Sequence, residues 1–331
     1  MTRGRAAPVL VLAGCGGVPS ALDPHAPEAA AIADLFWTFT GTAAAIWLAV
    51  AIALAIALAR RRGPRSDPMA TQPGSERVYA RVVASAVGLT LLTVLALTGL
   101  SFATQKAIFA DPEPGVSLRL IGHQWWWEVI YEDALPLRSF TTANEIHLPV
   151  GEPVKLRLGS EDVIHSFWVP SLAGKMDLIP GHENELRFTP EQVGLYRGQC
   201  AEFCGWQHAH MGLLVVVEPR EDFDAWRAAQ IAPAAPPQDT ERQRGEAVFL
   251  SGPCVMCHTV RGTPAGGRTG PDLTHLASRR SIAAATLPLT RGSLAAWIVD
   301  PQAIKPGAQM PLVPLQPDEI DPLAAYLAGL R

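Results

Sequence analysis

Charged side chains are scarce in this chain of 331 residues. Asp, Glu, Lys and Arg make up 18% of it, whereas they are roughly 25% of an average soluble protein. The deficit is concentrated near the N-terminus, which favours a membrane protein that carries soluble domains. No part of the sequence has Lys and Arg residues clustered on the scale that a nucleic-acid-binding face needs. No cluster of side chains has the pattern of an acid/base or nucleophilic catalyst.

Cysteine is also rare, with five residues in all. An odd number in an exported protein calls for a search for a free or modified thiol. Each of the five has a chemical use in the motifs below, so we expect no disulfide. The first, Cys15, follows a basic start and a short apolar run at residues 1–14, the composition of a secretory signal. With Cys at the cut it resembles a bacterial lipoprotein signal peptide, and Cys15 would be lipidated; an incidental cysteine among small residues is the alternative.

Two long stretches without charge follow, Leu35–Ala59 and Val82–Gln105. Each is longer than the ~20 apolar residues that a helix needs to span a bilayer, and neither has the polar stripe of a buried core helix. We therefore predict two transmembrane helices, at about residues 35–59 and 82–105, in an N-terminal segment that covers 15–110. The connection between them carries six arginines, whereas residues 21–34 carry no Lys or Arg. The positive-inside rule then puts the connection in the cytoplasm and everything after Lys106 outside.

Residues 111–220, here called the sandwich domain, change to short β-type runs broken by Gly and Pro. Such runs with turn signals predict an all-β sandwich. The runs are Ser117–Ile121, Trp125–Tyr131, Glu145–Leu148, Val154–Leu158, Glu185–Phe188 and Leu213–Val217. A loop between two of them carries Cys200, Cys204, His208 and Met211. We expect it at one end of the sandwich, because functional side chains usually lie on such loops.

That loop has the chemistry of a copper site. Two thiols, an imidazole and a thioether fall within twelve residues, and His165 in a separate loop completes the set. Soft sulfur donors beside imidazole suit copper. Zinc could take Cys200, Cys204, His208 and His165, but it would leave Met211 without a use. A single blue-copper centre needs one Cys, whereas two are the number required to bridge two coppers.

The C-terminal domain, residues 241–331, follows a linker at 221–240 that is first helix-like and then Ala/Pro-rich. It contains Cys254-Val-Met-Cys257-His258, the C-x-x-C-H pattern of covalent haem c attachment, in which His258 binds the iron. A zinc knuckle would need two further ligands, and a redox dithiol would not need the histidine. The second axial ligand is Met310 or, as the competing choice, His275. Met/His ligation gives the raised reduction potential of a carrier on the oxidising side of a respiratory chain.

Four stretches resemble subunit II of haem–copper cytochrome c oxidases: Gly122-His-Gln-Trp-Trp-Trp, His165-Ser-Phe-Trp-Val-Pro, Lys175-Met-Asp-Leu-Ile-Pro-Gly and the loop from Cys200 to Met211. The C-terminal domain is similar to class I cytochromes c, including Gly270-Pro271 between the ligands, as in the caa-type variant whose donor cytochrome is fused to this subunit. The implied fold is a multidomain membrane protein. It combines a two-helix transmembrane hairpin, an all-β cupredoxin-like sandwich and an all-α class I cytochrome c domain.

The resemblance also implies roles for single residues. The ligands of the binuclear copper centre CuA would be two bridging thiolates, two imidazoles, a thioether and a backbone carbonyl, from Cys200, Cys204, His165, His208, Met211 and Glu202. The Glu202 carboxylate would point toward a magnesium ion shared with the catalytic subunit. Electrons would enter near CuA at Trp125, with core packing as the alternative use of a tryptophan here. Glu76 lies roughly where the family has a carboxylate at the mouth of a proton pathway; a solvated charge beside Arg77 is the alternative.

Electron transfer is the function that this resemblance implies. An electron from a soluble or membrane-bound donor such as a cytochrome c would enter haem c, pass to CuA and leave to catalytic subunit I, which reduces oxygen to water at a bacterial inner membrane. One alternative is a membrane-anchored carrier without a dedicated oxidase, which would hold no haem besides the covalent one. Another is a copper chaperone, which would need no covalent haem.

Charge differs between the two outer domains. Residues 111–224 hold 18 acidic and 8 basic side chains, whereas residues 241–331 hold 7 acidic and 9 basic ones. Complementary patches orient transient partners, and the linker keeps the C-terminal domain at a roughly millimolar effective concentration. We therefore expect the C-terminal domain to dock near Trp125.

Overall fold

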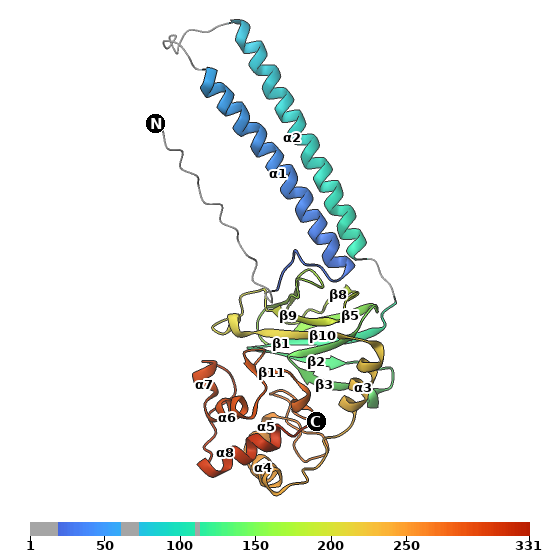
Figure 1. Cartoon of the computed structure of the whole chain (residues 1–331), viewed down its shortest axis with the longest axis vertical. Helices are drawn as coiled ribbons and strands as arrows, with labels where there is room; N and C mark the ends of the chain where they lie inside the picture. Colours follow the sequence, from blue (N-terminus) through green and yellow to red (C-terminus); the bar gives the residue numbers. More distant parts are fainter. Residues whose placement is uncertain (1–18, 61–72, 110–112) are drawn as a thin grey trace, which may run out of the picture.

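The computed structural model describes residues 19–60, 73–109 and 113–331 and shows three parts (Figure 1). Two long helices lie at one end, a β-sandwich lies in the middle, and a mainly helical domain lies at the other end. The expected signal peptide at residues 1–14 and the expected lipidation site Cys15 lie outside the described residues.

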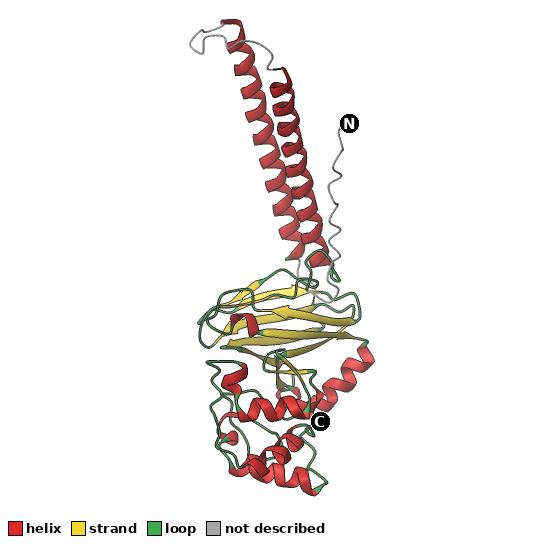
Figure 2. Cartoon of the chain, turned by 60° about the vertical axis from the view of Figure 1, so that its left-hand side comes forward, coloured by secondary structure: helices red, strands yellow, loops and turns green. Residues whose placement is uncertain are grey.

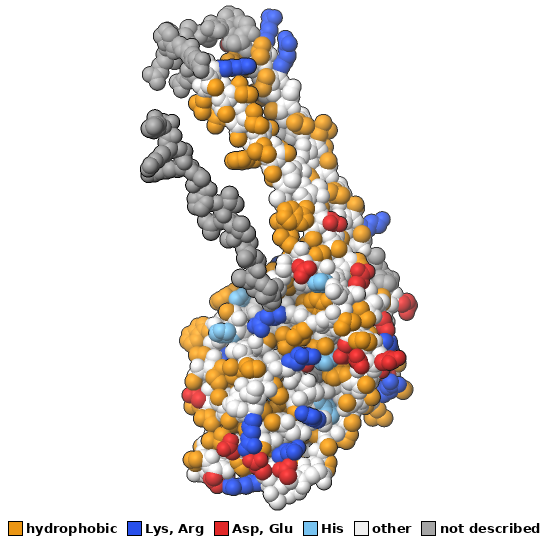
Figure 3. All heavy atoms as spheres, in the orientation of Figure 1, with side chains coloured by type: hydrophobic (Ala, Val, Ile, Leu, Met, Phe, Trp, Pro, Cys, Tyr) orange, Lys and Arg blue, Asp and Glu red, His pale blue; other side chains and the backbone are white. Residues whose placement is uncertain are grey.

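The two N-terminal helices are α1 (Pro27–Arg60) and α2 (Pro73–Ile108), and they contain the two apolar stretches found in the sequence. They run side by side (Figures 1 and 2). The most apolar part of each helix has none of its residues buried in the protein, and Figure 3 shows apolar side chains along the helix surface. Exposed apolar surface of this length fits lipid, so the helices anchor the chain in a membrane.

The start of α1 is attached to the sandwich domain. Just before the helix, the His25 N–H donates to the Ser171 carbonyl (2.7 Å). The Glu28 carboxylate in its first turn accepts a hydrogen bond from the Thr189 N–H (3.1 Å). Ala29, the next residue of the helix, is buried. The membrane helix therefore begins on the sandwich surface and leads away from it.

The sandwich domain consists of two main sheets. One has the strand order β3-β2-β1-β5-β8, and the other has the order β4-β10-β9. The strands are β1 (Val116–His123), β2 (Trp126–Tyr131), β3 (Phe140–Ala143), β4 (Glu145–Pro149), β5 (Val154–Ser160), β8 (Asn184–Phe188), β9 (Gly194–Gln199) and β10 (Gly212–Glu218), with β6 (His165–Phe167) and β7 (Met176–Leu178) as a separate pair. All six runs read from the sequence coincide with strands, except that Trp125 precedes β2.

Side-chain alternation explains how these strands build a core. Along β1, Leu118 and Leu120 are fully buried, whereas Arg119 between them is only partly covered. The next residue on each strand faces the opposite side because side chains alternate with period two. Burying a side chain as large as leucine contributes about 1.5–3 kcal/mol. The core, which also contains Trp127 and Phe167, makes the sandwich a firm frame for the loops at its end.

Trp125 lies in a turn rather than on a strand. The last pair of the β1–β2 hairpin joins His123 to Trp126, so Gln124 and Trp125 connect the two strands. The sequence-based placement of Trp125 on the strand was therefore wrong by one residue. The side chains still alternate along this segment, because Trp125 and Trp127 are buried and Trp126 is partly exposed.

The C-terminal domain is built from α4 (Thr240–Ser251), α5 (Cys254–Cys257), α6 (Arg291–Val299), α7 (Pro301–Ile304) and α8 (Pro317–Leu327), with a short hairpin of β11 (Ser281–Ile282) and β12 (Leu287–Pro288). Helices α4 and α8 approach closely because Gly245 has no side chain: a Cβ there would overlap the Pro322 carbonyl. Phe249, Leu294 and Tyr326 belong to the apolar core between the helices. The helical character predicted for this domain is confirmed, and the hairpin is an addition to it.

Helix α3 (Arg220–Ile231) joins the two outer domains. Its Trp226 ring stacks on His147 of the sandwich domain, with centroids 4.1 Å apart. Directly after the helix, the Ala232 carbonyl lies 2.8 Å from Nε2 of His275 in the C-terminal domain. The linker is therefore held against both outer domains and is not a free tether.

A pH-dependent stability follows from the surroundings of His147. Its Nδ1 lies 2.9 Å from a Glu218 carboxylate oxygen, and its Nε2 lies 3.1 Å from a Glu145 carboxylate oxygen. Burial favours the neutral ring, but the two carboxylates outweigh burial and raise the pKa of His147. Because the folded-state pKa is raised, the stabilisation is fully present below the ordinary pKa of about 6.5 and is lost as the pH rises through the raised value.

Thermal unfolding between about pH 6 and about pH 9 tests this account. The wild-type Tm should fall with rising pH more steeply than the Tm of His147→Gln, which cannot gain a charge. His182→Gln, at a histidine exposed on the sandwich surface, is the matched control and should follow the wild type. Parallel curves for wild type and His147→Gln would contradict the assignment.

Candidate functional site

The connection between β9 and β10 carries most of the sulfur and histidine side chains of the expected copper site. It begins after Gln199 and ends before Gly212. The Cys200 N–H donates to the Met211 carbonyl (2.9 Å), which closes the two ends of the loop against each other. His165 is the first residue of β6 and reaches the same place. The strands thus bring together side chains that are 35 positions apart in the sequence.

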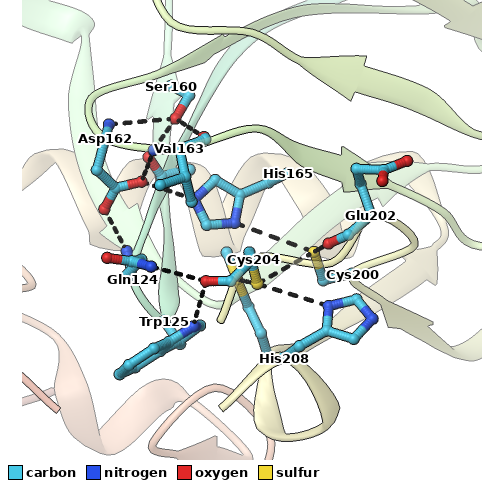
Figure 4. A network of polar contacts seen from close by, with 12 residues as sticks. Gln124, Trp125, Ser160, Asp162, Val163, His165, Cys200, Glu202, Cys204 and His208 are labelled. Carbon is cyan, nitrogen blue, oxygen red and sulfur yellow. Dashed lines mark hydrogen bonds and ion pairs between the residues drawn. The ribbon is translucent and has the colours of Figure 1, made fainter. Parts of the chain in front are cut away.

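These side chains form a compact group of donors (Figure 4). The sulfurs of Cys200 and Cys204 are 3.8 Å apart. The Cys200 sulfur lies 4.0 Å from Nδ1 of His165, while the Cys204 sulfur lies 3.5 Å from Nδ1 of His208 and 3.8 Å from the Met211 sulfur. Two thiols, two imidazoles and a thioether at these separations fit copper, because soft sulfur and imidazole donors select it over hard cations.

The two thiols influence each other's ionisation. The hydrogen bond between the sulfurs lowers the pKa of Cys200 to about 4 and raises the pKa of Cys204. The contact between the two sulfurs therefore favours ionisation of one thiol of the pair. A metal held here would take both sulfurs as thiolates, because the thiolate is the form of cysteine that binds metals.

Asp162 orients His165. Its carboxylate lies 2.8 Å from Nε2 of the imidazole, so that Nδ1 faces the Cys200 sulfur. Burial alone would lower the pKa of His165, but Asp162 and Cys200 outweigh it and raise that pKa. The carboxylate itself accepts hydrogen bonds from the N–H groups of Gln124 and Val163, both at 2.6 Å. A carboxylate behind an imidazole fixes the ring and its tautomer, as metal-binding histidines require.

The Cys204 carbonyl connects this cluster to Trp125. It accepts hydrogen bonds from Nε1 of Trp125 (2.9 Å) and from Nε2 of Gln124 (2.7 Å). The Trp125 side chain is therefore fixed by the same residue whose sulfur lies in the middle of the donor group (Figure 4).

Glu202 lies at the edge of the donor group. Its carbonyl is 3.2 Å from the Cys200 sulfur. Its carboxylate points away from the sulfurs (Figure 4) and lies 3.7 Å from Nζ of Lys175, with 44% of the side chain exposed. The two polar ends of this residue thus face different surroundings, one toward the cluster and one toward the surface.

A cavity in the C-terminal domain collects the residues expected to hold haem c. Cys254, Cys257, His258 and Met310 all line it. Two thiols, an imidazole and a thioether around one largely apolar cavity fit a covalently attached haem c with Met/His axial ligation. The competing ligand His275 is absent from the lining, and its Nε2 bonds the linker carbonyl instead.

His258 is held in one orientation. Its Nδ1 donates to the Pro271 carbonyl (2.7 Å). Burial lowers the pKa of this histidine, so the ring is neutral and its Nε2 can serve as a ligand. A Cβ at Gly270 would lie 2.8 Å from Cε1 of the ring, so the missing side chain lets the backbone pack on the imidazole. The Gly-Pro pair thereby positions the ring.

The sandwich domain closes one side of this cavity. Gln124, Trp125 and Trp126 lie on its wall together with residues of the C-terminal domain. Trp125 therefore borders the cavity and also donates to the Cys204 carbonyl. A single side chain links the cavity to the group of copper-type donors.

The other residues singled out in the sequence lie elsewhere. Glu76 is in the first turn of α2, at the end of the helix that is remote from the sandwich domain (Figure 1). His210, in the same loop as His208 but outside the group of donors, is exposed, and its Nδ1 lies 2.8 Å from Oε1 of Gln207.

Sequence reasoning missed three residues at this site: Asp162, Gln124 and Lys305. Asp162 precedes His165 by three positions, and no local pattern distinguishes it from a surface acid. Gln124 stands beside Trp125 in a quoted motif, but its contact with the Cys204 carbonyl requires the folded loop. Lys305 reaches the Trp125 carbonyl from another domain, so no sequence spacing could indicate it.

Comparison with known proteins adds an independent finding. The family profile described as "Cytochrome C oxidase subunit II, periplasmic domain" matches residues 132–218, and the profile "Cytochrome c" matches residues 242–331. The cytochrome c oxidase subunit 2 of Alkalihalophilus pseudofirmus is 34% identical and covers 97% of this chain and 94% of its own length. The cytochrome c oxidase subunit 2 of Bacillus sp. (strain PS3) is 32% identical and covers 82% of this chain and 79% of its own length. The crystal structure of the periplasmic domain of subunit II of cytochrome oxidase of Bradyrhizobium japonicum is 29% identical, with a TM-score of 0.35, and covers 37% of this chain and 96% of that one.

The two profiles fall on the two outer domains, and the match to the Alkalihalophilus protein also includes the two membrane helices. The donor group in the sandwich domain and the C-x-x-C-H cavity in the C-terminal domain are the features that a copper- and haem-containing oxidase subunit needs. The chain belongs to the cytochrome c oxidase subunit 2 family.

Proposed function

We propose that this chain receives electrons at a haem c in its C-terminal domain (residues 241–331) and passes them to a copper pair in its sandwich domain (residues 111–220). As a subunit II, it is the part of a cytochrome c oxidase at which electrons are accepted. One observation carries the proposal. Trp125 borders the cavity of the C-terminal domain and donates a hydrogen bond to the Cys204 carbonyl.

The copper pair would be held by the donor group described above: the side chains of His165, Cys200, Cys204, His208 and Met211 and the carbonyl of Glu202. When bound, it would supply one-electron transfer. The residues around it do the positioning. Asp162 keeps Nδ1 of His165 facing the sulfurs, and Gln124 with Trp125 holds the Cys204 carbonyl.

The haem would be attached through Cys254 and Cys257, with His258 and Met310 as iron ligands. When bound, it would be a second one-electron carrier. The chain fixes His258 through the Pro271 carbonyl. Because Trp125 lies in the cavity wall, the sandwich domain also shields the haem site from water on that side.

Further partners follow from the surfaces. The Glu202 carboxylate would be a ligand of a magnesium ion shared with catalytic subunit I, because hard cations take oxygen ligands.

The helices anchor the chain and the two outer domains lie outside, so we assign the chain to the bacterial inner membrane, with a cytochrome c as electron donor. Glu76 would then lie on the cytoplasmic side, at the mouth of a proton pathway, and Cys15 would carry lipid.

One optical and paramagnetic-resonance spectrum of the purified chain tests this proposal. It should show a c-type haem and a mixed-valence copper pair together. A chain that shows haem c but only a single copper would contradict the proposal. A chain that shows no copper signal at all would also contradict it.

The axial ligand gives a separate prediction. In Met310→Ala the haem should remain covalently attached, because the thioether bonds form at other residues. The sulfur-to-iron absorption band should disappear and the reduction potential should fall, because a thioether ligand raises the potential. An optical titration of the reduced and oxidised protein measures both effects.

Two control variants make this test specific. Met256→Ala removes the exposed methionine inside the attachment motif and should keep the band. His275→Ala should keep it too, because that ring bonds the linker. If His275→Ala loses the band while Met310→Ala keeps it, the axial ligand has been assigned wrongly.

A further inference from the structure

A buried lysine crosses the boundary between the two outer domains. Lys305 follows α7 in the C-terminal domain and is only 2% exposed. Its Nζ donates to the Trp125 carbonyl of the sandwich domain (2.6 Å) and to the Ala283 carbonyl of its own domain (3.2 Å). Within the described part of the chain no carboxylate forms an ion pair with it. An ammonium group buried without a carboxylate is costly, and its hydrogen bonds are its compensation.

The residues after Lys305 surround Trp125 from a second side. The Pro306 carbonyl accepts a hydrogen bond from Nε2 of Gln207 in the loop of the copper-type donors (2.8 Å). At Gly307 a Cβ would lie 3.4 Å from the Trp125 ring, so the chain packs directly on the indole. Lys305 therefore holds the backbone of Trp125 while its neighbours contact the ring.

A strained turn at residues 283–285 contacts both Lys305 and the strand that follows the loop of copper-type donors. Ala283, Ala284 and Ala285 all have positive φ, at 53°, 57° and 57°. This left-handed conformation is unfavourable for residues with a Cβ and persists only where surrounding contacts impose it. Burial lowers the pKa of Lys305 to about 7, yet a neutral amine also donates to the first carbonyl of this turn.

The remaining carbonyls of the turn are held by the sandwich domain. The Ala284 carbonyl accepts from the Gly212 N–H (3.1 Å), and the Ala285 carbonyl accepts from the Arg197 guanidinium (3.2 Å). Gly212 directly follows Met211, one of the donors. The contacts of the turn thus depend on the docked arrangement of the two domains.

We propose that Lys305 is a positioning residue that locks the C-terminal domain onto Trp125, with the left-handed alanine turn at residues 283–285 as the second point of the lock. The inference rests on the proposed function, because it names what holds the two electron-carrying domains together. Lys305 fixes the carbonyl of Trp125, and the turn fixes the strand that begins beside Met211. The first contact point is the turn between β1 and β2, at Trp125, and the second is formed by Arg197 and Gly212, on the two strands that flank the loop of copper-type donors.

The test compares Lys305→Met with wild type and with Lys155→Met in the full, haem- and copper-loaded chain. Methionine has a similar length but no donor. The control lysine pairs with Glu185 on the surface of the sandwich sheet. Hydrogen exchange is followed in peptides that cover residues 281–288 and Gly212, whose N–H bonds to the turn only in the docked state. Flash-induced transfer from haem to copper is measured on the same samples.

In Lys305→Met, exchange in both peptides should be about tenfold faster, the size expected for losing one buried hydrogen bond. Internal electron transfer should slow in parallel, while both metal spectra stay unchanged. Lys305→Gln keeps a hydrogen-bond donor, so its exchange and transfer rates should lie between those of wild type and Lys305→Met. Lys155→Met should match wild type. The Gln variant also keeps the test decisive if the Met variant folds poorly.

Unchanged exchange together with an unchanged transfer rate in Lys305→Met would overturn the inference. So would a shifted haem potential with unchanged exchange, because Lys305 would then act on the haem and not on docking. Either outcome leaves the proposed function intact as long as the wild type transfers electrons internally. A wild type without internal transfer would instead contradict the proposed function.

Discussion

We expect Cys204→Ser to lose the signal of the proposed binuclear copper centre while the absorption of haem c remains. A serine hydroxyl is not ionised at neutral pH and cannot bridge two coppers as a thiolate does. The Cys204 sulfur lies within 3.8 Å of the sulfurs of Cys200 and Met211 and 3.5 Å from Nδ1 of His208. Its removal takes away the centre of the donor group. The haem signal should survive, because Cys254 and Cys257 lie in another domain.

The copper content of the purified variant and its paramagnetic-resonance spectrum measure this effect. Cys200→Ser should lose the signal as well, because both sulfurs would be needed to hold two coppers. His210→Gln changes an exposed histidine of the same loop outside the donor group and should keep two coppers. A Cys204→Ser protein that retained two coppers with unchanged spectra would refute the ligand assignment.

The second large effect is expected at Trp125. In Trp125→Phe, transfer between haem and copper should slow markedly while both metal spectra stay the same. Phenylalanine keeps most of the packing but lacks Nε1, so the hydrogen bond to the Cys204 carbonyl is lost. Such a bond contributes a net of about 1 kcal/mol to stability, too little to unfold the domain. The change should therefore be seen in the transfer rate and not in the yield of folded protein.

Trp126→Phe is the matched control for this experiment. Trp126 lies on the same cavity wall, but its ring stacks on His123 with centroids 4.3 Å apart. The Trp126→Phe protein should transfer electrons from haem to copper at the wild-type rate. Equal rates in Trp125→Phe and wild type would exclude Trp125 from the route.

Local patterns in the sequence were enough for much of this protein. The C-x-x-C-H motif needs only five consecutive residues, and the uncharged stretches at Leu35–Ala59 and Val82–Gln105 need only their length. Alternation along β1 and β5 is regular enough to predict strands. These features were recoverable because each depends on neighbours in the chain and not on tertiary contacts.

The strands that escaped prediction lack such a local signal. β6 and β7 have three residues each, and β3 has four, too few for an alternation to be seen. β9 contains two glycines and exposes alternate residues at the edge of its sheet. Its pairing with β10 decides its conformation. Trp125 was misplaced for a related reason, since the end of a hairpin is set by register and not by residue type.

Contacts between domains were outside the reach of the sequence. The opposite net charges predicted attraction, yet Lys305 and Arg197 both cross the boundary to carbonyl oxygens and not to carboxylates. Hydrogen bonds of this kind depend on shape and are little screened when buried.

Flash reduction of the haem across a series of salt concentrations tests the central claim most directly. Transfer from haem to copper should be independent of protein concentration and nearly independent of salt, because both carriers sit in one chain whose domains are locked by buried contacts. Reduction of the haem by a soluble donor should depend on salt more strongly, because exposed charges steer that encounter. A haem-to-copper rate that rises with protein concentration, or that falls with salt as steeply as the bimolecular step, would contradict electron transfer within the chain.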